Sequence, residues 1–161
     1  MADASNSAAN SAGEGLVVSL LHGPNLNLLG EREPTIYGTA TLADYVAAAS
    51  QTASEFGLTV EAFQTNHEGQ LVDAIHAARG RSVAIIINPG AFTHYAWSLH
   101  DALAAFEGPV IEVHISNPNA REAWRHTSVV SPVAAGTIVG LGLHGYELAV
   151  RAVARMIGKN S

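Results

Sequence analysis

Apolar residues occur along the chain in short runs that are separated by polar and glycine-rich stretches. Runs of this length, rich in β-branched residues and bounded by turn residues, are typical of buried strands. The pattern predicts five strands, at residues 16–21, 58–65, 83–87, 110–116 and 137–141. Helical spacing of apolar positions predicts helices between and after them, at residues 42–56, 68–79, 93–106, 119–126 and 146–157.

Several helix boundaries carry the residue types that begin or end helices. Thr41 stands at the N-cap position of the first helix, and Thr93 opens the third. Gly57 and Gly80 follow the first two helices, and Gly108 precedes a proline after the third. These signals support the alternation of strands and helices that the apolar pattern gives.

Five strands alternating with helices predict right-handed βαβ crossovers and a parallel sheet with helices on both faces. For a chain of this size we expect a flavodoxin-like, doubly wound α/β fold, a three-layer αβα arrangement with strand order 2-1-3-4-5. Residues 1–15 are small, polar and low in complexity, so we expect a disordered tail. Residues 16–158 should form a single domain of this fold.

Composition narrows the class of protein. The chain has 161 residues, 48% of them apolar and 14% charged, which fits one globular domain and excludes a disordered chain. A net charge of −6 argues against nucleic-acid binding, and the apolar runs are too short to span a membrane. There is no cysteine, hence no thiolate metal site, and the N-terminus lacks a secretion signal. We expect a cytoplasmic protein.

Polar residues gather after the first, third and fourth strands. Parallel sheets bind ligands beyond the carboxyl ends of their strands, where the strand order reverses. In the predicted order, that point lies between the first and third strands, next to the fourth. The candidates are Asn25, Asn27, Glu31, Arg32 and Tyr37 in a long first loop, Asn88, Thr93 and His94 after the third strand, and His114, Ser116, Asn117, Arg121 and Arg125 after the fourth.

Each candidate also has a purely structural explanation. Asn25 fits a turn, Tyr37 a surface aromatic, and His94 a solvated residue at a helix start. Arg121 and Arg125 are four residues apart and fit a solvated helix face. His114 is harder to explain in this way, although a satisfied core histidine remains open. Glu112 lies on the same face of its strand, and a carboxylate beside an imidazole favours the protonated ring.

Two further features bear on the type of chemistry. The sequence Gly140-Leu-Gly142-Leu-His-Gly145 matches a dinucleotide-binding pattern, but it lies in the last βα unit without a later acidic partner. We therefore expect its glycines to permit close packing of helix on sheet. Lys159, near the C-terminus, is the only lysine, which argues against Schiff-base catalysis.

Longer motifs resemble those of one family, type II 3-dehydroquinate dehydratase. The resemblance runs from about residue 16 to the last helix, in order and with the family's spacing. GPNLNLLGEREPTIYG and EVHISN are its most specific parts. It is carried by residues 20–38 (LLHGPNLNLLGEREPTIYG), 64–78 (QTNHEGQLVDAIHAA), 87–94 (INPGAFTH), 111–125 (IEVHISNPNAREAWR) and 131–149 (SPVAAGTIVGLGLHGYELA).

The resemblance implies loss of water from 3-dehydroquinate to give 3-dehydroshikimate, in the shikimate route to aromatic amino acids, without metal or organic cofactor. Tyr37 matches the general base, Arg32 the cation that activates it, Asn25 the group that orients a water against the enolate, and His114 the general acid. Asn88, His94, Ile115 (through its backbone), Ser116 and Arg125 match substrate-holding positions.

The resemblance also implies a homododecamer of trimers, in which Asp101 reaches the site of a neighbouring subunit. This chain departs from the family pattern at Tyr95, Trp97 and His100, which could alter subunit packing. The catalytic set is intact.

The implied roles agree with the chemistry of the side chains. A phenol has an ordinary pKa of about 10, so a basic Tyr37 needs nearby positive charge. Arg32 lies five residues before it, and Arg121 could supply a second cation in support. Glu112 could keep His114 cationic and oriented. Two alternatives remain: a non-catalytic flavodoxin-like module that binds a nucleotide or flavin, and a scaffold retained for assembly. The scaffold would be expected to lose Tyr37, Arg32 or His114, and all three are present.

Overall fold

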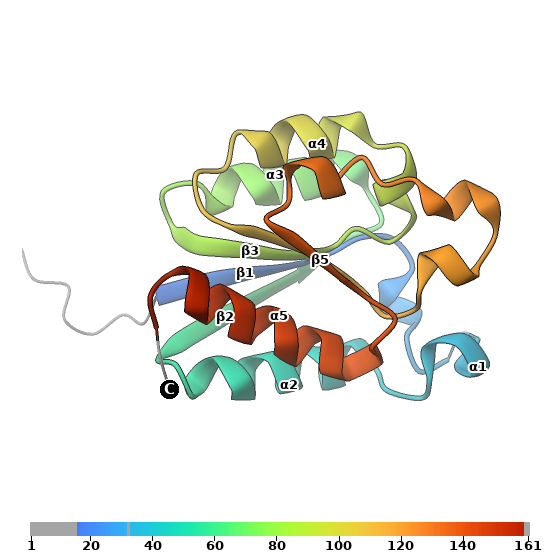
Figure 1. The fold of residues 1–161 in the computed structure, drawn as a ribbon, viewed down its shortest axis with the longest axis horizontal. Helices are drawn as coiled ribbons and strands as arrows, with labels where there is room; N and C mark the ends of the chain where they lie inside the picture. Colours follow the sequence, from blue (N-terminus) through green and yellow to red (C-terminus); the bar gives the residue numbers. More distant parts are fainter. Residues whose placement is uncertain (1–15, 32, 160–161) are drawn as a thin grey trace, which may run out of the picture.

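A computed structural model describes residues 16–31 and 33–159. The predicted tail, residues 1–15, and Arg32 lie outside the described residues. The strands form one parallel sheet in the order β2-β1-β3-β4-β5, which confirms the predicted fold class (Figure 1). The strands are β1 (Leu16–His22), β2 (Leu58–Gln64), β3 (Ser82–Asn88), β4 (Val110–His114) and β5 (Gly136–Val139).

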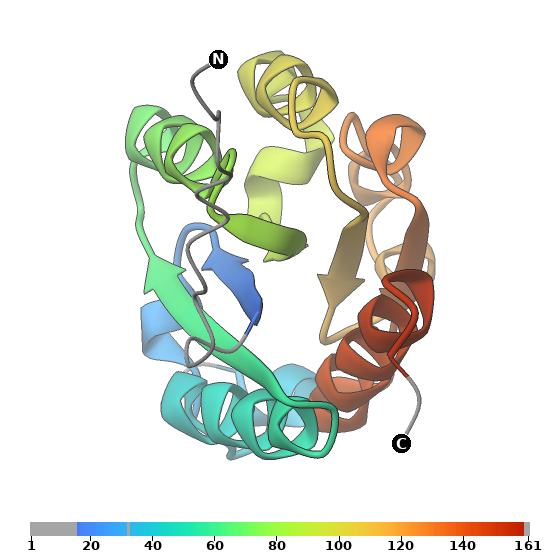
Figure 2. The ribbon, with the colours of Figure 1, turned by 90° about the vertical axis from the view of Figure 1, so that its left-hand side faces the viewer.

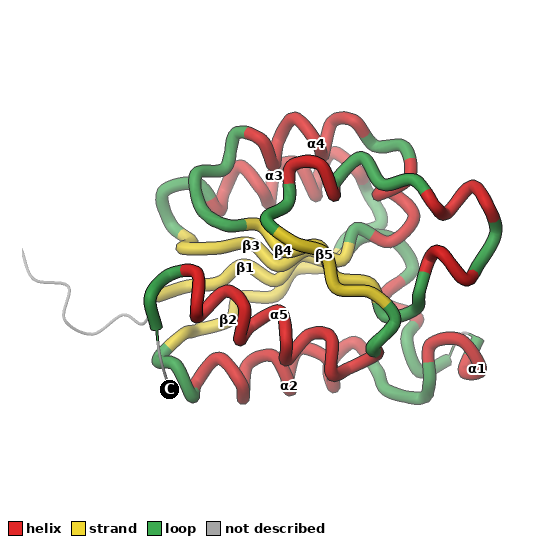
Figure 3. The backbone as a smooth tube through the Cα atoms, in the orientation of Figure 1, coloured by secondary structure: helices red, strands yellow, loops and turns green. Residues whose placement is uncertain are grey.

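Helices cover both faces of the sheet (Figures 2 and 3). On one face, α2 (Leu42–Ser54) packs beside α5 (Gly142–Met156), and their buried side chains include Tyr45, Ala49 and Val150. On the other face, α3 (Glu68–Ala78) packs beside α4 (Trp97–Ala104), with Leu71 and Leu99 buried. The central strands are apolar on both faces because both faces are covered.

The start of α2 is fixed by its cap, as predicted. The Thr41 hydroxyl accepts from the Asp44 backbone N–H (3.3 Å), and the Thr41 N–H donates to the Asp44 carboxylate (2.8 Å). This reciprocal capping box satisfies two backbone donors at the helix N-terminus. It ends the long connection that follows β1.

That connection contains two short elements that the sequence pattern did not predict. A 3-10 helix spans Leu26–Leu28, and α1 spans Pro34–Tyr37. Asn25 precedes them with φ 66°, a left-handed conformation that asparagine tolerates. Both elements are only three or four residues long, too short to show a period.

Three predicted helices differ from the structure, the last of them mainly in its start, because α5 begins at Gly142 and not at residue 146. Residues 93–106 do not form one helix: a 3-10 helix at Gly90–His94 is followed by α4, which begins at Trp97. Thr93 does not open that helix: it lies inside the 3-10 helix, and its hydroxyl donates to Glu112. Residues 119–126 form no α-helix either: two 3-10 segments, Pro118–Ala120 and Ala123–His126, are separated there by Arg121 and Glu122.

The strand ends also shift, and these shifts shape the site. β4 was predicted to reach residue 116 but ends at His114, so Ile115 and Ser116 leave the sheet. The loops after β1 and β3 press together at Gly23, whose N–H donates to the Asn88 carbonyl (2.8 Å). A Cβ atom at Gly23 would lie 2.1 Å from the Pro89 carbonyl oxygen. Only glycine permits this approach.

Candidate active site

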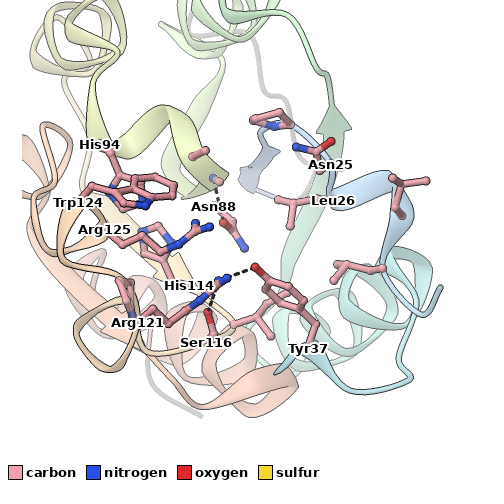
Figure 4. A pocket seen from close by; sticks show the side chains of 17 residues that line it. Asn25, Leu26, Tyr37, Asn88, His94, His114, Ser116, Arg121, Trp124 and Arg125 are labelled. Carbon is pink, nitrogen blue, oxygen red and sulfur yellow. Dashed lines mark hydrogen bonds between the residues drawn. The ribbon is translucent and has the colours of Figure 1, made fainter. Parts of the chain in front are cut away.

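A cavity opens at the carboxyl ends of β1, β3 and β4, where the strand order reverses (Figure 4). Three loops that are distant in sequence line it, as the sequence predicted. Its polar lining side chains come from Asn25, Tyr37, Asn88, His94, His114, Ser116, Arg121 and Arg125. Its apolar lining includes Leu26, Leu28, Leu29 and Trp124.

Tyr37 and Arg121 meet across the cavity from segments 84 positions apart. Arg121 Nη1 donates to the Tyr37 hydroxyl at 2.6 Å, and its guanidinium carbon lies 5.5 Å from the centre of the ring. The Arg121 side chain is only 15% exposed. A largely desolvated guanidinium that donates to a phenol oxygen stabilises negative charge on that oxygen.

His114 reaches the cavity from the end of β4 and is held from behind by Glu112. Its Nε2 lies 2.7 Å from Glu112 Oε1. Glu112 is fully buried and also accepts from the hydroxyls of Thr93, Ser128 and Ser131. Burial alone would raise the pKa of Glu112, but hydrogen bonds and the charge of His114 hold it below its usual value. The dyad predicted from the two-residue spacing is therefore present in the structure.

Asn88 is oriented at the end of β3 by two contacts. Its amide nitrogen donates to the buried Tyr146 hydroxyl at 2.9 Å, and its amide oxygen accepts from the Gly90 N–H at 3.2 Å. His22, at the end of β1, stacks on Tyr146 with ring centres 5.7 Å apart. A chain of buried aromatic groups thus supports the floor of the cavity.

His94, Trp124 and Arg125 form one wall. His94 Nδ1 donates to the Thr127 carbonyl at 2.7 Å, which leaves Nε2 as the acceptor nitrogen of a neutral ring. Burial chiefly lowers the pKa of His94, and the charges of His114 and Arg125 lower it further. The Trp124 ring meets His94 edge-on at 5.2 Å, and the Arg125 guanidinium lies 4.0 Å from the Trp124 ring centre.

Asn25 lies on the opposite wall, beside Leu26 (Figure 4). Its backbone N–H donates to Asn66 Oδ1 at 2.9 Å, and Asn66 in turn accepts from Gln64 Nε2 at 3.1 Å. The left-handed backbone of Asn25 and this bond from the end of β2 together fix its position at the cavity rim.

Most of the predicted site residues thus lie together. Ile115 and Ser116 line the cavity, and Glu112 stands behind His114 as a support. Asp101 does not line the cavity: it is exposed on α4. Arg32 lies outside the described residues, so its predicted role stays a prediction.

The structure adds residues that sequence reasoning missed: Trp124, Ser128 and Ser131. An aromatic directly before Arg125 was the signal that could have indicated Trp124. Nothing local marks the two serines, because their partner Glu112 lies 16 and 19 positions away. Across residues 16–31 and 33–159, no cluster of three or more His, Asp or Glu side chains could hold a metal ion. Nor does any helix there have the length and apolar character needed to cross a membrane.

Two of the three glycines at residues 140–145 are closely packed, which agrees with the packing role expected for them, whereas a Cβ atom on Gly142 would meet nothing within 4 Å. Gly142 and Gly145 lie within α5. A Cβ atom on Gly145 would lie 3.4 Å from Ile138 of β5, and one on Gly140 would lie 3.1 Å from the Asn117 side chain.

Comparison with known proteins identifies a family for this chain. Residues 16–154 match the family model described as dehydroquinase class II. The chain is 56% identical over 140 residues to a catabolic 3-dehydroquinase of Aspergillus clavatus, covering 87% of this chain and 93% of that one. It is 54% identical over 141 residues to 3-dehydroquinate dehydratase 2 of Pseudomonas putida, covering 88% and 95% respectively.

Solved structures lead to the same family. The type II dehydroquinase from Propionibacterium acnes superposes with a TM-score of 0.83 at 46% sequence identity, covering 88% of this chain and 99% of that one. The resemblance seen in the sequence motifs is confirmed over nearly all of the described residues. The chain belongs to the class II dehydroquinase family.

Proposed function

We propose that the chain catalyses the reversible dehydration of 3-dehydroquinate to 3-dehydroshikimate through an enolate, a hydro-lyase reaction of the shikimate pathway. Relatives named 3-dehydroquinate dehydratase at 54% identity support this assignment. One structural observation carries it. Tyr37 and His114, each with its own charged partner, face the same cavity.

The base half consists of Tyr37 and Arg121. Elimination begins with removal of a proton from the carbon next to the ketone, and a phenolate at Tyr37 accepts it. The bond from Arg121 Nη1 (2.6 Å) stabilises the phenolate that this step requires. Arg32, five positions before Tyr37, adds a second cation in this proposal.

The acid half consists of His114 and Glu112. With Nε2 bonded to Glu112, the other ring nitrogen, Nδ1, is the one left to donate. It gives a proton to the departing hydroxyl, which leaves as water. Glu112 favours the imidazolium before the transfer and fixes the ring orientation throughout it.

The remaining polar groups hold the substrate and the enolate. Asn25 orients a water against the enolate oxygen, where negative charge develops. Asn88, Ser116 and the backbone of Ile115 bind substrate at the ends of β3 and β4, and His94 with Arg125 binds it at the wall. Arg121 and Arg125 also give an acidic chain a local positive field for an anionic substrate.

Assembly and setting form part of the same proposal. We assign a homododecamer of trimers in which Asp101, exposed on α4, reaches the site of a neighbouring subunit. Tyr95 and Trp97, 58% and 62% exposed beside it, give that surface an apolar character that suits a subunit contact. We also assign residues 16–158 as the catalytic domain and a cytoplasmic location.

The activity is tested by following enone absorbance in the ultraviolet after addition of 3-dehydroquinate. The proposal expects turnover by the purified protein, and no enone formation at saturating substrate would overturn it. Treatment with borohydride and substrate should leave activity intact, because the steps use acid–base groups and no lysine lines the cavity. Inactivation by borohydride would contradict the mechanism. Light scattering of the same sample tests the dodecamer.

A further inference from the structure

Three hydroxyl side chains surround the carboxylate of Glu112 behind the cavity. Thr93 donates to Oε1, and Ser131 donates to Oε2 at 2.5 Å. Ser128 lies between the two oxygens, 3.0 Å from Oε1 and 3.1 Å from Oε2. With His114 Nε2, four donors converge on this one carboxylate.

The surroundings of Ser128 leave its hydroxyl proton available to Glu112. Its Oγ accepts hydrogen bonds from the backbone N–H groups of Val130 (3.1 Å) and Ser131 (2.9 Å), and it also lies 2.8 Å from the Thr93 hydroxyl. Every polar group in contact with the Glu112 carboxylate can therefore donate to it. Each hydrogen bond that a carboxylate accepts stabilises its charged form over the protonated one, and four such donors lie around Glu112. The surroundings select the ionised form.

The positive charge that balances the Glu112 carboxylate is then that of His114. Glu112 has no exposed surface, and a buried charge requires an opposite charge in contact. His94, Arg125 and His126 are the other titratable or charged side chains around the small cavity that Glu112 and His114 share. His100 approaches the same loop through the Val129 carbonyl (2.7 Å). Only His114 contacts Glu112 itself among these groups.

The hydroxyls come from two segments that the backbone joins together. Thr93 belongs to the 3-10 helix after β3, and Ser128 and Ser131 precede β5. The Val129 N–H donates to the Thr93 carbonyl at 2.7 Å, which fixes the two segments against each other. The hydroxyls are therefore positioned by backbone contacts rather than by the side chain that they bind.

We propose that Thr93, Ser128 and Ser131 are positioning residues for the dehydration: they hold Glu112 ionised and aimed at His114, so that His114 carries the proton it donates. We call these three side chains the hydroxyl clamp. This inference rests on the proposed role of His114 as general acid. None of the three touches the substrate in this scheme, and they act through Glu112.

Ser131→Ala and Ser128→Ala test the hydroxyl clamp. Each variant removes one donor to the ionised carboxylate, and we expect kcat to fall roughly tenfold or more with little change in KM. Ser131→Thr keeps the hydroxyl and should restore most of the rate. Ser19→Ala is the matched control, because it removes a buried hydroxyl that bonds to Ser82 (2.8 Å) at the start of β3, and neither serine lines the candidate site. It should retain the wild-type kcat.

A double-variant cycle with His114→Asn separates positioning from general damage. If the hydroxyl clamp acts through His114, adding Ser131→Ala to His114→Asn should cost no further kcat. A carbon-13 NMR titration gives a second readout: the pKa of the Glu112 carboxyl should rise in Ser131→Ala, because a donor to the ionised form is gone.

The outcomes distinguish the inference from the proposal on which it rests. A wild-type kcat in His114→Asn would refute the role of His114 itself. A large loss in His114→Asn with unchanged kcat in both serine variants would refute the hydroxyl clamp alone. Equal losses from Ser131→Ala with and without His114 would also refute it, since the serine would then serve only the fold.

Discussion

The two halves of the candidate site are built in different ways. Glu112 and His114 belong to a buried strand, and their partners lie at the ends of neighbouring elements. Tyr37 lies at the end of a four-residue helix whose Thr35 and Ile36 are exposed. Its carbonyl accepts a long bond from the Tyr45 hydroxyl (3.5 Å), and its own hydroxyl accepts from Arg121.

The acid half is therefore held rigidly by the sheet, whereas the base half lies where substrate can enter. The acid half is organised by the sheet before substrate arrives, which suits a group that must keep its charge while buried. The base half lies on a long surface connection, and we propose that this connection closes over the substrate and excludes water. Substitutions in the base half should therefore change rate with little change in stability, whereas those in the sheet should change stability as well.

The largest expected effect is that of Tyr37→Phe. Loss of the phenol oxygen removes the base, and we expect kcat to fall by about a thousandfold or more. The melting temperature should stay close to wild type, because phenylalanine keeps the ring that packs against the core. Steady-state kinetics and calorimetry measure both quantities. Near-normal turnover in this variant would remove Tyr37 from the mechanism.

The next largest effect concerns the free energy of unfolding at acid pH, through His22 at the end of β1. Burial lowers the pKa of His22 from 6.5 to about 4, and within the described residues its Nε2 has no hydrogen-bond partner. The imidazole of His22 therefore binds a proton more tightly in the unfolded chain than in the folded one. The contribution of neutral His22 to the free energy of unfolding is full above pH 6.5 and is lost as the pH falls towards 4. The loss amounts to about 3 kcal/mol.

His22→Asn tests this contribution through denaturant unfolding at neutral and acid pH. The free energy of unfolding should fall less towards pH 4 in the variant than in wild type. His144→Asn is the control, because His144 is exposed and pairs with Glu147 at 2.8 Å on the surface of α5. Parallel acid curves for wild type and His22→Asn would contradict the prediction.

Arg121→Ala should have the next largest effect. We expect kcat to fall about a hundredfold, because the phenolate loses a charge-assisted donor. Arg121→Lys keeps the charge but not the planar donor group, and its rate should lie between those of Arg121→Ala and wild type. Arg151→Ala, which breaks a surface pair with Glu55 (2.9 Å) on the far side of the molecule, should leave the rate unchanged. Equal rates for Arg121→Ala and wild type would contradict the role of Arg121 in stabilising the Tyr37 phenolate.

The smallest expected effect is that of Trp124→Ala. Trp124 supports both His94 and Arg125, which we assign to substrate binding. Without it, KM should rise about tenfold while kcat changes little. Trp124→Phe retains an aromatic ring between the two groups and should keep most of the affinity. A fall in kcat alone would place Trp124 in a different role.

The fold was largely predictable because its signals are local. Strands of fully apolar residues, a threonine before α2 and glycines after α2 and α3 each report on their own neighbourhood. The failures came where a tertiary contact overrode local pattern. Thr93 has the pattern of a helix start, but in the structure it lies in a 3-10 helix with its hydroxyl bonded to Glu112, and α4 begins only at Trp97.

The sequence predicts where the site lies, but not which side chains contact each other within it. Strand ends in a parallel sheet meet at one edge, so Asn88 and His114 had to lie near each other. The contact of Arg121 with Tyr37 spans 84 positions and has no local trace. The hydrogen bonds from Ser128 and Ser131 to Glu112 also cannot be predicted from the sequence. Serines before a strand are common, and only the folded backbone brings these two hydroxyls to Glu112.

Proton exchange at the carbon next to the ketone tests the division of labour most directly. NMR in deuterium oxide can follow loss of that hydrogen from 3-dehydroquinate in the Tyr37→Phe and His114→Asn variants. The account predicts that His114→Asn still exchanges the hydrogen while elimination falls steeply, and that Tyr37→Phe loses both. Exchange that survives in Tyr37→Phe, or disappears in His114→Asn, would contradict it.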